Sequence, residues 1–335
     1  MKLNNQQHAS SVRFRWFPYH LGLAIALSTT VACVQAATSS EFFPQPVYTT
    51  LTKANGVEEM ATSRTIEGLP TAHYDAISAD GKWLMVSSKD QPEAYLLDAQ
   101  SGKKLATYKI GKVPQGVAIS PDGRWGMAVA AGEGTVSIID LKTRKLVRTI
   151  IVGKTPHNIR FTRDSRIAYV TLQGGSGVAV VDMASLKKIG EIPVPGIKGP
   201  HNLDLSADGK TLWVRDFVGK VAAVDIASRK VEAVIPVGLG HGGIDVTPDG
   251  RYVVAGAIAD HVVDVIDPKT KKVIKRIDVG QGPHGVRASA DGRWIYASVT
   301  GTNRIAVIDA GTLTVAKQVA ITGQVPFWIS VVGND

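Results

Sequence analysis

The chain has 335 residues, of which 44% are hydrophobic and 20% are charged, and its formal net charge is +9 at pH 7. This composition is typical of a folded globular protein and excludes a disordered or collagen-like chain. With one cysteine, Cys33, the chain cannot be a disulfide-stapled scaffold.

The first 36 residues differ from the rest. They contain three positive residues and no acid, a short apolar core at 21–27, and small residues before Ala37. This layout predicts a signal peptide at 1–36 and a periplasmic protein, because the apolar core is too short to span a membrane. The residues ending in Cys33 also resemble a lipobox, so a lipoprotein anchored through Cys33 is an alternative. Without residues 1–36 the chain has 35 basic and 29 acidic residues, and no cysteine.

From residue 69 onward, a sequence motif that ends in Asp-Gly or a variant of it recurs every 41 to 44 residues. The copies are "AHYDAISADGK" (72–82), "PQGVAISPDGR" (114–124), "PHNIRFTRDSR" (156–166), "PHNLDLSADGK" (200–210), "GGIDVTPDGR" (242–251), "PHGVRASADGR" (283–293) and "PFWISVVGND" (326–335). Each complete unit continues with an apolar run, a polar loop, a strand-like run ending in Asp, a Lys-rich turn and a last apolar run. Four short strands per unit are typical of a propeller blade.

The spacing therefore predicts an all-β fold, a seven-bladed β-propeller of four-stranded blades. Six full repeats run over about 69–323. We expect residues 46–68 and 324–335 to form the closing blade together, which joins strands from both ends and removes free sheet edges. The whole of 37–335 is predicted to be a single domain.

The histidines after residue 36 gather at one point of this pattern. His73, His157, His201 and His284 occupy the same position at the entry to the first strand, His241 lies one residue before it, and His261 lies in a loop. In a propeller these loops share one face, here called the upper face, and the Asp-Gly and Lys-rich turns share the lower face. Duplication of a turn-like entry explains the recurrence as a structural habit. A ligand site is the alternative, because neutral imidazoles bind copper, iron or zinc or ligate a haem.

The candidate metal ligands are His157, His201, His241 and His284. Phe327 and Trp328 occupy the entry in the closing blade, where they either plug the ring or pack a planar ligand, so Trp328 is a further ligand-binding candidate. No partner is identified beyond a small ligand or a protein of the cell envelope.

Charged residues follow three positions after the aligned entry in four consecutive blades: Arg160, Asp204, Asp245 and Arg287. Ion pairing between blades is the structural interpretation, and a charged wall that orients a polar ligand below the histidines is the functional one. Asp216 and Asp260 are expected in upper loops, as candidate partners for His201 and His261.

Lysines and arginines are concentrated in the turns at 142–145, 187–188, 229–230 and 269–272. They are either solvated turn residues or a binding surface for an acidic partner. The turns carry no interleaved aromatic residues, which disfavours nucleic acid. The sequence has no nucleophile elbow, Walker loop or Cys-x-x-Cys-His motif, so a covalently attached c-type haem is excluded.

Two segments, "YVTLQGGSGVAVVD" (169–182) and "YASVTGTNRIAVID" (296–309), resemble the YVTN-type propeller repeat. That class is related to the d1-haem (cytochrome D1-like) propeller domains of bacterial nitrite reductases. The resemblance implies a propeller in the bacterial envelope and allows haem d1 as a cofactor, although those domains have more blades and an attached cytochrome module.

Three functions follow as hypotheses. The first is a periplasmic binding or interaction protein with a His-rich ligand site at the top of the channel. The second is a redox protein, or a cofactor chaperone, that depends on copper, iron or haem d1. The third is a propeller lactonase or lyase. The sequence leaves open whether the protein is an enzyme and favours a binding role.

Overall fold

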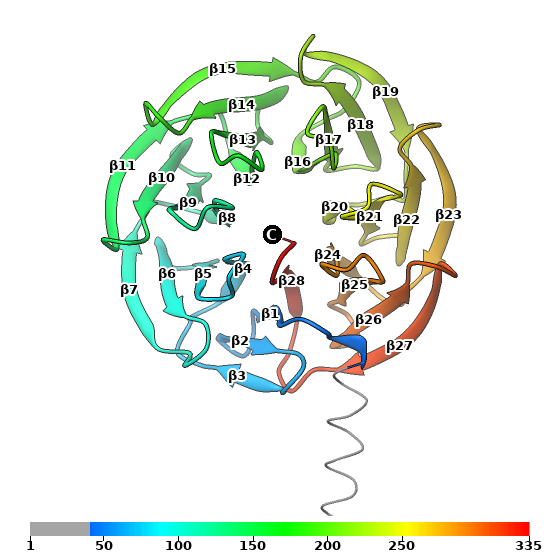
Figure 1. Ribbon diagram of the computed structural model, residues 1–335, viewed down its shortest axis with the longest axis horizontal. Helices are drawn as coiled ribbons and strands as arrows, with labels where there is room; N and C mark the ends of the chain where they lie inside the picture. The colour runs from blue at the N-terminus through cyan, green and yellow to red at the C-terminus, as the bar shows by residue number, and fades with distance from the viewer. Residues whose placement is uncertain (1–40, 335) are drawn as a thin grey trace, which may run out of the picture. The chain divides into compact units, whose positions relative to one another are not determined.

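The computed structural model describes residues 41–334, which contain 28 β-strands in seven four-stranded sheets. The sheets are antiparallel and follow one another as blades around the middle of the ring, which we call the channel (Figure 1). The predicted seven-bladed all-β propeller is confirmed. No helix among residues 41–334 has the length and hydrophobicity that a membrane crossing requires. The predicted signal peptide lies outside the described residues.

The innermost strands of blades one to seven are β4 (Ala72–Ile77), β8 (Pro114–Ile119), β12 (Pro156–Phe161), β16 (Pro200–Leu205), β20 (Ile244–Val246), β24 (Pro283–Ala288) and β28 (Pro326–Val331). The second strands are β5 (Trp83–Ser88), β9 (Trp125–Ala130), β13 (Ile167–Leu172), β17 (Thr211–Asp216), β21 (Val253–Ala257), β25 (Trp294–Val299) and β1 (Val47–Leu51). The third strands are β6 (Glu93–Asp98), β10 (Thr135–Asp140), β14 (Gly177–Asp182), β18 (Lys220–Asp225), β22 (Val262–Asp267), β26 (Arg304–Asp309) and β2 (Gly56–Glu59). The outermost strands are β7 (Lys104–Lys109), β11 (Lys145–Ile151), β15 (Lys187–Pro193), β19 (Lys230–Pro236), β23 (Lys272–Asp278), β27 (Thr314–Ala320) and β3 (Arg64–Ile66).

Blade seven closes the ring as the sequence predicts. Its sheet has the order β28-β1-β2-β3, so the innermost strand comes from one end of the described chain and the other three from the opposite end. Val47 pairs with Val331, and the Thr49 hydroxyl donates to the Trp328 carbonyl at 2.8 Å. These bonds remove the two open sheet edges that an unclosed ring would expose.

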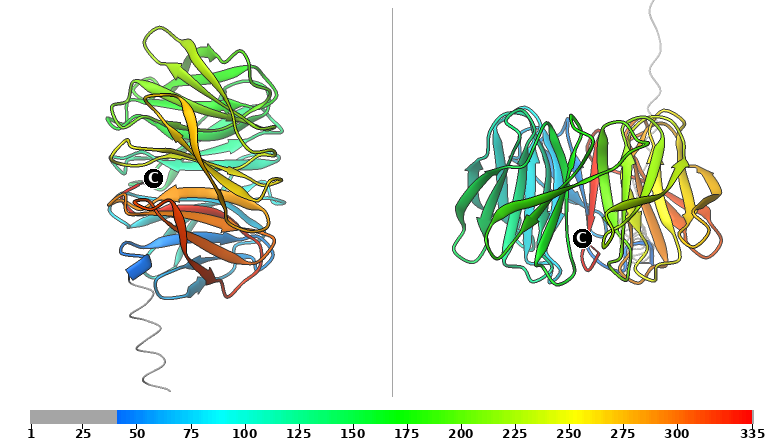
Figure 2. Two further views of the ribbon diagram at one scale, coloured as in Figure 1. Left: turned by 90° about the vertical axis from the view of Figure 1, so that its right-hand side faces the viewer. Right: turned by 90° about the horizontal axis from the view of Figure 1, so that it is seen from above.

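The core lies between the blades. Seven clusters of buried apolar side chains each join one blade to its neighbour, as Met127 and Val170 do between blades two and three. Seen from the side, the strands run between the upper and lower faces of the ring (Figure 2). Because both faces of every sheet are buried against a neighbour, the ring holds each innermost strand in a fixed place on the channel wall.

The turns between first and second strands are built by a repeated Ser/Thr-x-Asp-Gly pattern. In blade one, the Ser78 hydroxyl donates to the Asp80 carboxylate at 2.6 Å and accepts from the Trp83 amide at 2.8 Å. Gly81 has φ 71°, which favours glycine, and blade three uses Ser165 there with φ 60°. The sequence predicted the Asp-Gly turn but not the role of the Ser or Thr before it.

Candidate functional site

An irregularity in the innermost strands directs two successive side chains toward the channel. In blade three, Pro156 pairs with Leu172 but the next paired residue is Ile159, opposite Val170, so the strand bulges at His157 and Asn158. The same shift occurs in β4, β8, β16 and β24. A bulge adds one residue and re-aims side chains, which is how both His157 and its neighbour face inward.

Seven aromatic rings then form a closed circuit around the channel. The centroid distances are 3.7 Å for His157–His201, 5.0 Å for His201–His241, 5.1 Å for His241–His284, 3.6 Å for His284–Phe327, 4.2 Å for Phe327–His73, 4.9 Å for His73–Tyr74 and 5.6 Å for Tyr74–His157. Five of these rings are the predicted histidines, and Phe327 fills the gap between His284 and His73. We call this set the ring layer.

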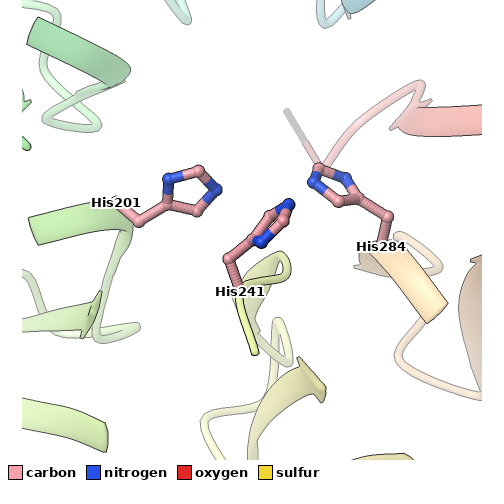
Figure 3. Close-up of side chains that lie close together, drawn as sticks. All are labelled: His201, His241 and His284. Atoms are coloured by element: carbon pink, nitrogen blue, oxygen red, sulfur yellow. The ribbon is translucent and has the colours of Figure 1, made fainter. Parts of the chain in front are cut away.

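Within the ring layer, three histidines from neighbouring blades come closest to a metal-binding arrangement. His201 lies on β16, His241 on the loop before β20 and His284 on β24, and their ligand atoms all lie within 4.8 Å of one another (Figure 3). Of the four predicted metal ligands, His157 is not in this triad. Its Nδ1 is instead 3.0 Å from the His201 carbonyl oxygen, to which it donates.

Burial keeps these imidazoles neutral. It lowers the pKa of both His73 and His157 to about 3, and it places the pKa values of His201 and His284 well below the ordinary range. The pKa of His241 is also lowered, first by burial and then by the charge of Arg215. Neutral imidazole is the form that binds metals.

Several buried ring nitrogens have no hydrogen-bond partner among the described residues: Nδ1 of His73, both nitrogens of His201 and Nε2 of His284. The Nδ1 of His284 lies 3.2 Å from the Phe327 carbonyl oxygen, which can only accept, so Nδ1 carries the hydrogen. The Nε2 of His284 therefore presents a lone pair. A backbone carbonyl on Nδ1 and a free Nε2 are what metal-binding histidines usually have.

His241 reaches the triad from a glycine-rich segment, "GLGHGG" at 238–243. Here the first strand is shortened to β20 (Ile244–Val246), and the segment packs too closely for side chains: a Cβ on Gly243 would lie 2.7 Å from the Val286 amide nitrogen. The break in the repeat is the sequence signal that singles out this histidine.

The remaining predicted upper-face residues have other partners. His261 is exposed in the loop between β21 and β22, and its Nδ1 accepts from the Gly282 amide at 3.3 Å. Asp216 accepts from the amides of its own loop, including Gly219 at 2.7 Å, and Asp260 accepts from the Leu239 amide at 2.9 Å. The suggested pairing of these two acids with His201 and His261 is wrong, because their carboxylates hold backbone amides.

A polar layer lies directly below the ring layer. Asn158 donates to the Asn202 side chain, which donates in turn to the Gly242 carbonyl at 2.7 Å.

Trp328 is 2% exposed, with its ring 4.5 Å from that of Tyr74. Trp328 is thus buried against Tyr74, as the plug interpretation expects.

The four charged residues of the channel wall pair across blades at the lower end. A guanidinium nitrogen of Arg160 lies 3.2 Å from a carboxylate oxygen of Asp204, and another lies 3.7 Å from one of Asp245. The same carboxylate oxygen of Asp245 lies 3.3 Å from the Arg287 guanidinium. Burial raises the pKa of Asp245 above its ordinary value. A cavity of about 310 Å³ opens here, lined by Arg160, Asp204, Asp245 and Asn334 among others. The Asn334 amide donates to Asp245 at 3.0 Å.

The Lys-rich turns lie on the lower face, and two of their lysines are ion-paired. Lys188 lies 3.0 Å from Glu191, and Lys271 lies 2.9 Å from Glu232. Both pairs are partly exposed, so they contribute little to stability.

Comparisons of the sequence and the fold with known proteins find similar propellers. Residues 218–326, less than half of the chain, match the family model described as the cytochrome D1 heme domain. No curated protein matches the chain. This match confirms the resemblance to d1-haem propeller domains, and the chain has a cytochrome D1-like propeller fold.

Three solved structures illustrate the likeness. Hydrazine synthase of Kuenenia stuttgartiensis is 22% identical, with a TM-score of 0.70 over 78% of this chain and 90% of that chain. A functionally unknown protein from Desulfotomaculum acetoxidans is 15% identical, with a TM-score of 0.75 over 87% and 100%. The dihydro-heme d1 dehydrogenase NirN, in complex with DHE, is 18% identical, with a TM-score of 0.62 over 86% and 75%. At these identities the likeness shows the fold alone.

Proposed function

We propose that the protein is a periplasmic binding protein that holds one transition-metal ion, copper above all, between His201, His241 and His284. The observation that carries this proposal is the triad itself: three neutral imidazoles whose ligand atoms lie within 4.8 Å of one another. The group contains no carboxylate or thiolate. An all-imidazole set suits copper, zinc and iron, and copper(II) binds such sites most tightly among the divalent first-row metals.

The residues fit a bare ion. Metal–imidazole bonds of ~2.1 Å put ligand atoms roughly 3–4 Å apart. The three atoms here lie within 4.8 Å of one another, so a ring movement of about an ångström completes the site. His241 is the ring best able to move, because it is only partly buried and lies on the glycine-rich segment. Little proton competition opposes binding near neutral pH, since burial lowers the pKa of every ligand.

The chain supplies position and environment. His284 is oriented by the Phe327 carbonyl, and His201 is held against the ring of His157. Three protein ligands leave a coordination position open for a small ligand. When bound, a copper ion supplies a one-electron couple or a Lewis-acid centre at that position.

A haem d1-related role is the second candidate. The cytochrome D1 match favours it, because residues 218–326 include His241 and His284. The space among three ligand atoms within 4.8 Å of one another is, however, far narrower than a haem macrocycle. A haem macrocycle therefore cannot lie between these three ligand atoms. The lactonase or lyase hypothesis gains no support, since Asp204 and Asp245 are paired with arginines.

The test is elemental analysis and an absorption spectrum of protein purified from the periplasm, followed by copper titration of His241→Ala and His261→Ala. We expect about one copper per chain in the wild type and at least tenfold weaker binding in His241→Ala, because losing only a hydrogen-bond partner of a metal ligand already weakens metal sites about 10–100-fold. His261→Ala is the matched control: it removes an exposed histidine of the same blade and face, and binding should be unchanged.

A metal-free, colourless protein whose thermal stability ignores added copper would overturn the proposal. Iron with a haem spectrum, in place of copper, would establish the second candidate instead.

A further inference from the structure

Arg215 is a buried cation with unused donors. It lies on β17 and is 0% exposed. Its Nη2 donates to the Gly238 and Gly240 carbonyls at 3.2 and 2.7 Å. Its Nε and Nη1 have no hydrogen-bond partner among residues 41–334, and no ion pair within that range involves it. An unmatched guanidinium in a protein interior is costly, so a missing partner is the natural explanation.

The acids near Arg215 are already engaged. Asp216 holds the amides of its own loop, and Asp264 accepts from the Gly238 amide at 2.6 Å and pairs with Arg276 at 2.9 Å. Burial lowers the pKa of Arg215 to about 10, and the negative charges of both carboxylates raise it only in part. Neither of them contacts its guanidinium as an ion pair.

Arg215 belongs to the surroundings of the triad. Gly240, whose carbonyl it holds, directly precedes His241. The charge of Arg215 lowers the pKa of His241 and contributes to the lowered pKa of His201. Arg215 pairs in the sheet with Asn202, the neighbour of His201, and its guanidinium holds the carbonyl that precedes His241, so Arg215 lies beside two members of the triad.

We infer that the metal centre takes a small monovalent oxyanion or carboxylate in its open position, held in place by the unused donors of Arg215. This inference rests on the proposed metal site. A divalent ion among neutral imidazoles, beside a buried guanidinium, concentrates positive charge where water cannot screen it. A bound anion offsets that charge and accepts the hydrogen bonds that Arg215 leaves unmade. The anion must be small, because His201, His284 and Arg215 are each at most 3% exposed.

The experiment uses azide as a spectroscopic probe and formate as its competitor. Copper stoichiometry is measured first, for the wild type, Arg215→Lys, Arg215→Gln and the control Arg304→Gln, which removes an exposed arginine of blade six. Azide is then titrated into each copper-loaded protein by its charge-transfer absorption, and formate is used to displace it.

We expect azide to bind the wild type and Arg304→Gln with equal affinity and Arg215→Gln at least tenfold more weakly, because hydrogen bonds from a charged donor have that effect. Arg215→Lys keeps the charge with fewer donors, so its affinity should be intermediate. Equal azide affinity in the wild type and Arg215→Gln, with one copper in each, overturns the inference and leaves the metal site standing. Absence of copper from the wild type overturns both.

If Arg215→Gln does not fold, crystals of the copper-loaded wild type soaked in bromide decide the matter. Anomalous density within hydrogen-bonding distance of Arg215 supports the inference. Bromide found only elsewhere, with the copper site occupied, contradicts it.

Discussion

At the scale of single residues, burial of His157 makes the stability of the metal-free protein depend on pH. The pKa of His157 is about 3 in the folded chain and close to 6.5 when unfolded, so between these values the unfolded state binds more protons. Stability from this residue is complete above pH 6.5 and is lost as the pH falls toward 3. Between pH 7 and pH 5 the loss amounts to about 2 kcal/mol.

The measurement is urea unfolding of metal-free wild type and His157→Phe at both pH values. The wild type should lose about 2 kcal/mol more than the variant on acidification. Phe keeps a ring against His201, and the His201 carbonyl still accepts from the Thr171 hydroxyl at 2.8 Å. Equal losses in the two proteins would show that His157 is not buried in neutral form.

Individual residues of the candidate site differ in how far the sequence alone could predict their positions. The gathering of histidines on one face followed from the repeat register. The closeness of His241 to His201 and His284 did not, because it depends on how the glycine-rich segment bends. The sequence placed Arg215 among the charged residues of the upper loops but carried no sign of its burial, since an arginine at the end of a strand is usually solvent-exposed.

At the scale of elements, the hairpins between third and outermost strands share a residue in the left-handed region. Blade one uses Gly102 with φ 74°, whereas the other full blades use Arg144, Leu186, Arg229, Lys271 and Leu313 with φ between 53° and 57°. Because this conformation is strained for residues with a Cβ, Arg229→Gly should raise the free energy of unfolding by about 0.5–1 kcal/mol. Denaturant unfolding measures it.

The reciprocal change, Gly102→Ala, is the control and should lower stability by about 1–2 kcal/mol. Its new Cβ is strained and would lie 3.2 Å from Ile66 Cγ1. Shifts of the same sign in the two variants would contradict the argument.

The strands and turns could be predicted from the sequence because each turn is marked by Asp, Gly or Lys residues. The bulges were not readable. "PHNI" looks like an ordinary strand entry, and the second-strand hydroxyl that accommodates the bulge, Thr171 in blade three, lies 13 residues from Asn158. The pairing that reveals a bulge exists only once both strands are in place.

At the scale of the whole molecule, β28 is the element whose loss the ring cannot tolerate. Truncation after residue 325 removes it, and with it the buried Trp328, Ile329 and Val331. The effect should be comparable with the entire net stability of roughly 5–15 kcal/mol, so the shortened chain should not fold cooperatively. Circular dichroism and thermal melting test this.

Truncation after residue 332 is the matched control. It removes Asn334 and its bonds to Asp245 and Ala288 but keeps β28, so this protein should remain folded. A folded, cooperative chain after truncation at 325 would contradict the role of β28.

The number of blades and their closure were predictable because periodicity is a global property of the sequence. The channel contents were not, since seven unequal side chains meet there and their packing is decided jointly. Phe327 shows this best: its ring lies between those of His284 and His73, from blades six and one.

The pairing of β28 with β1 also has a kinetic consequence. Thr49 and Trp328, which bond to each other, are 279 residues apart, so blade seven cannot assemble until nearly all of the described chain is available. Contacts of such long range slow folding, because the entropy of closing the loop is lost before the contact forms. Until then β1 presents an unpaired edge, and the ring layer lacks Phe327. The ring layer is therefore among the last parts of the molecule to become complete.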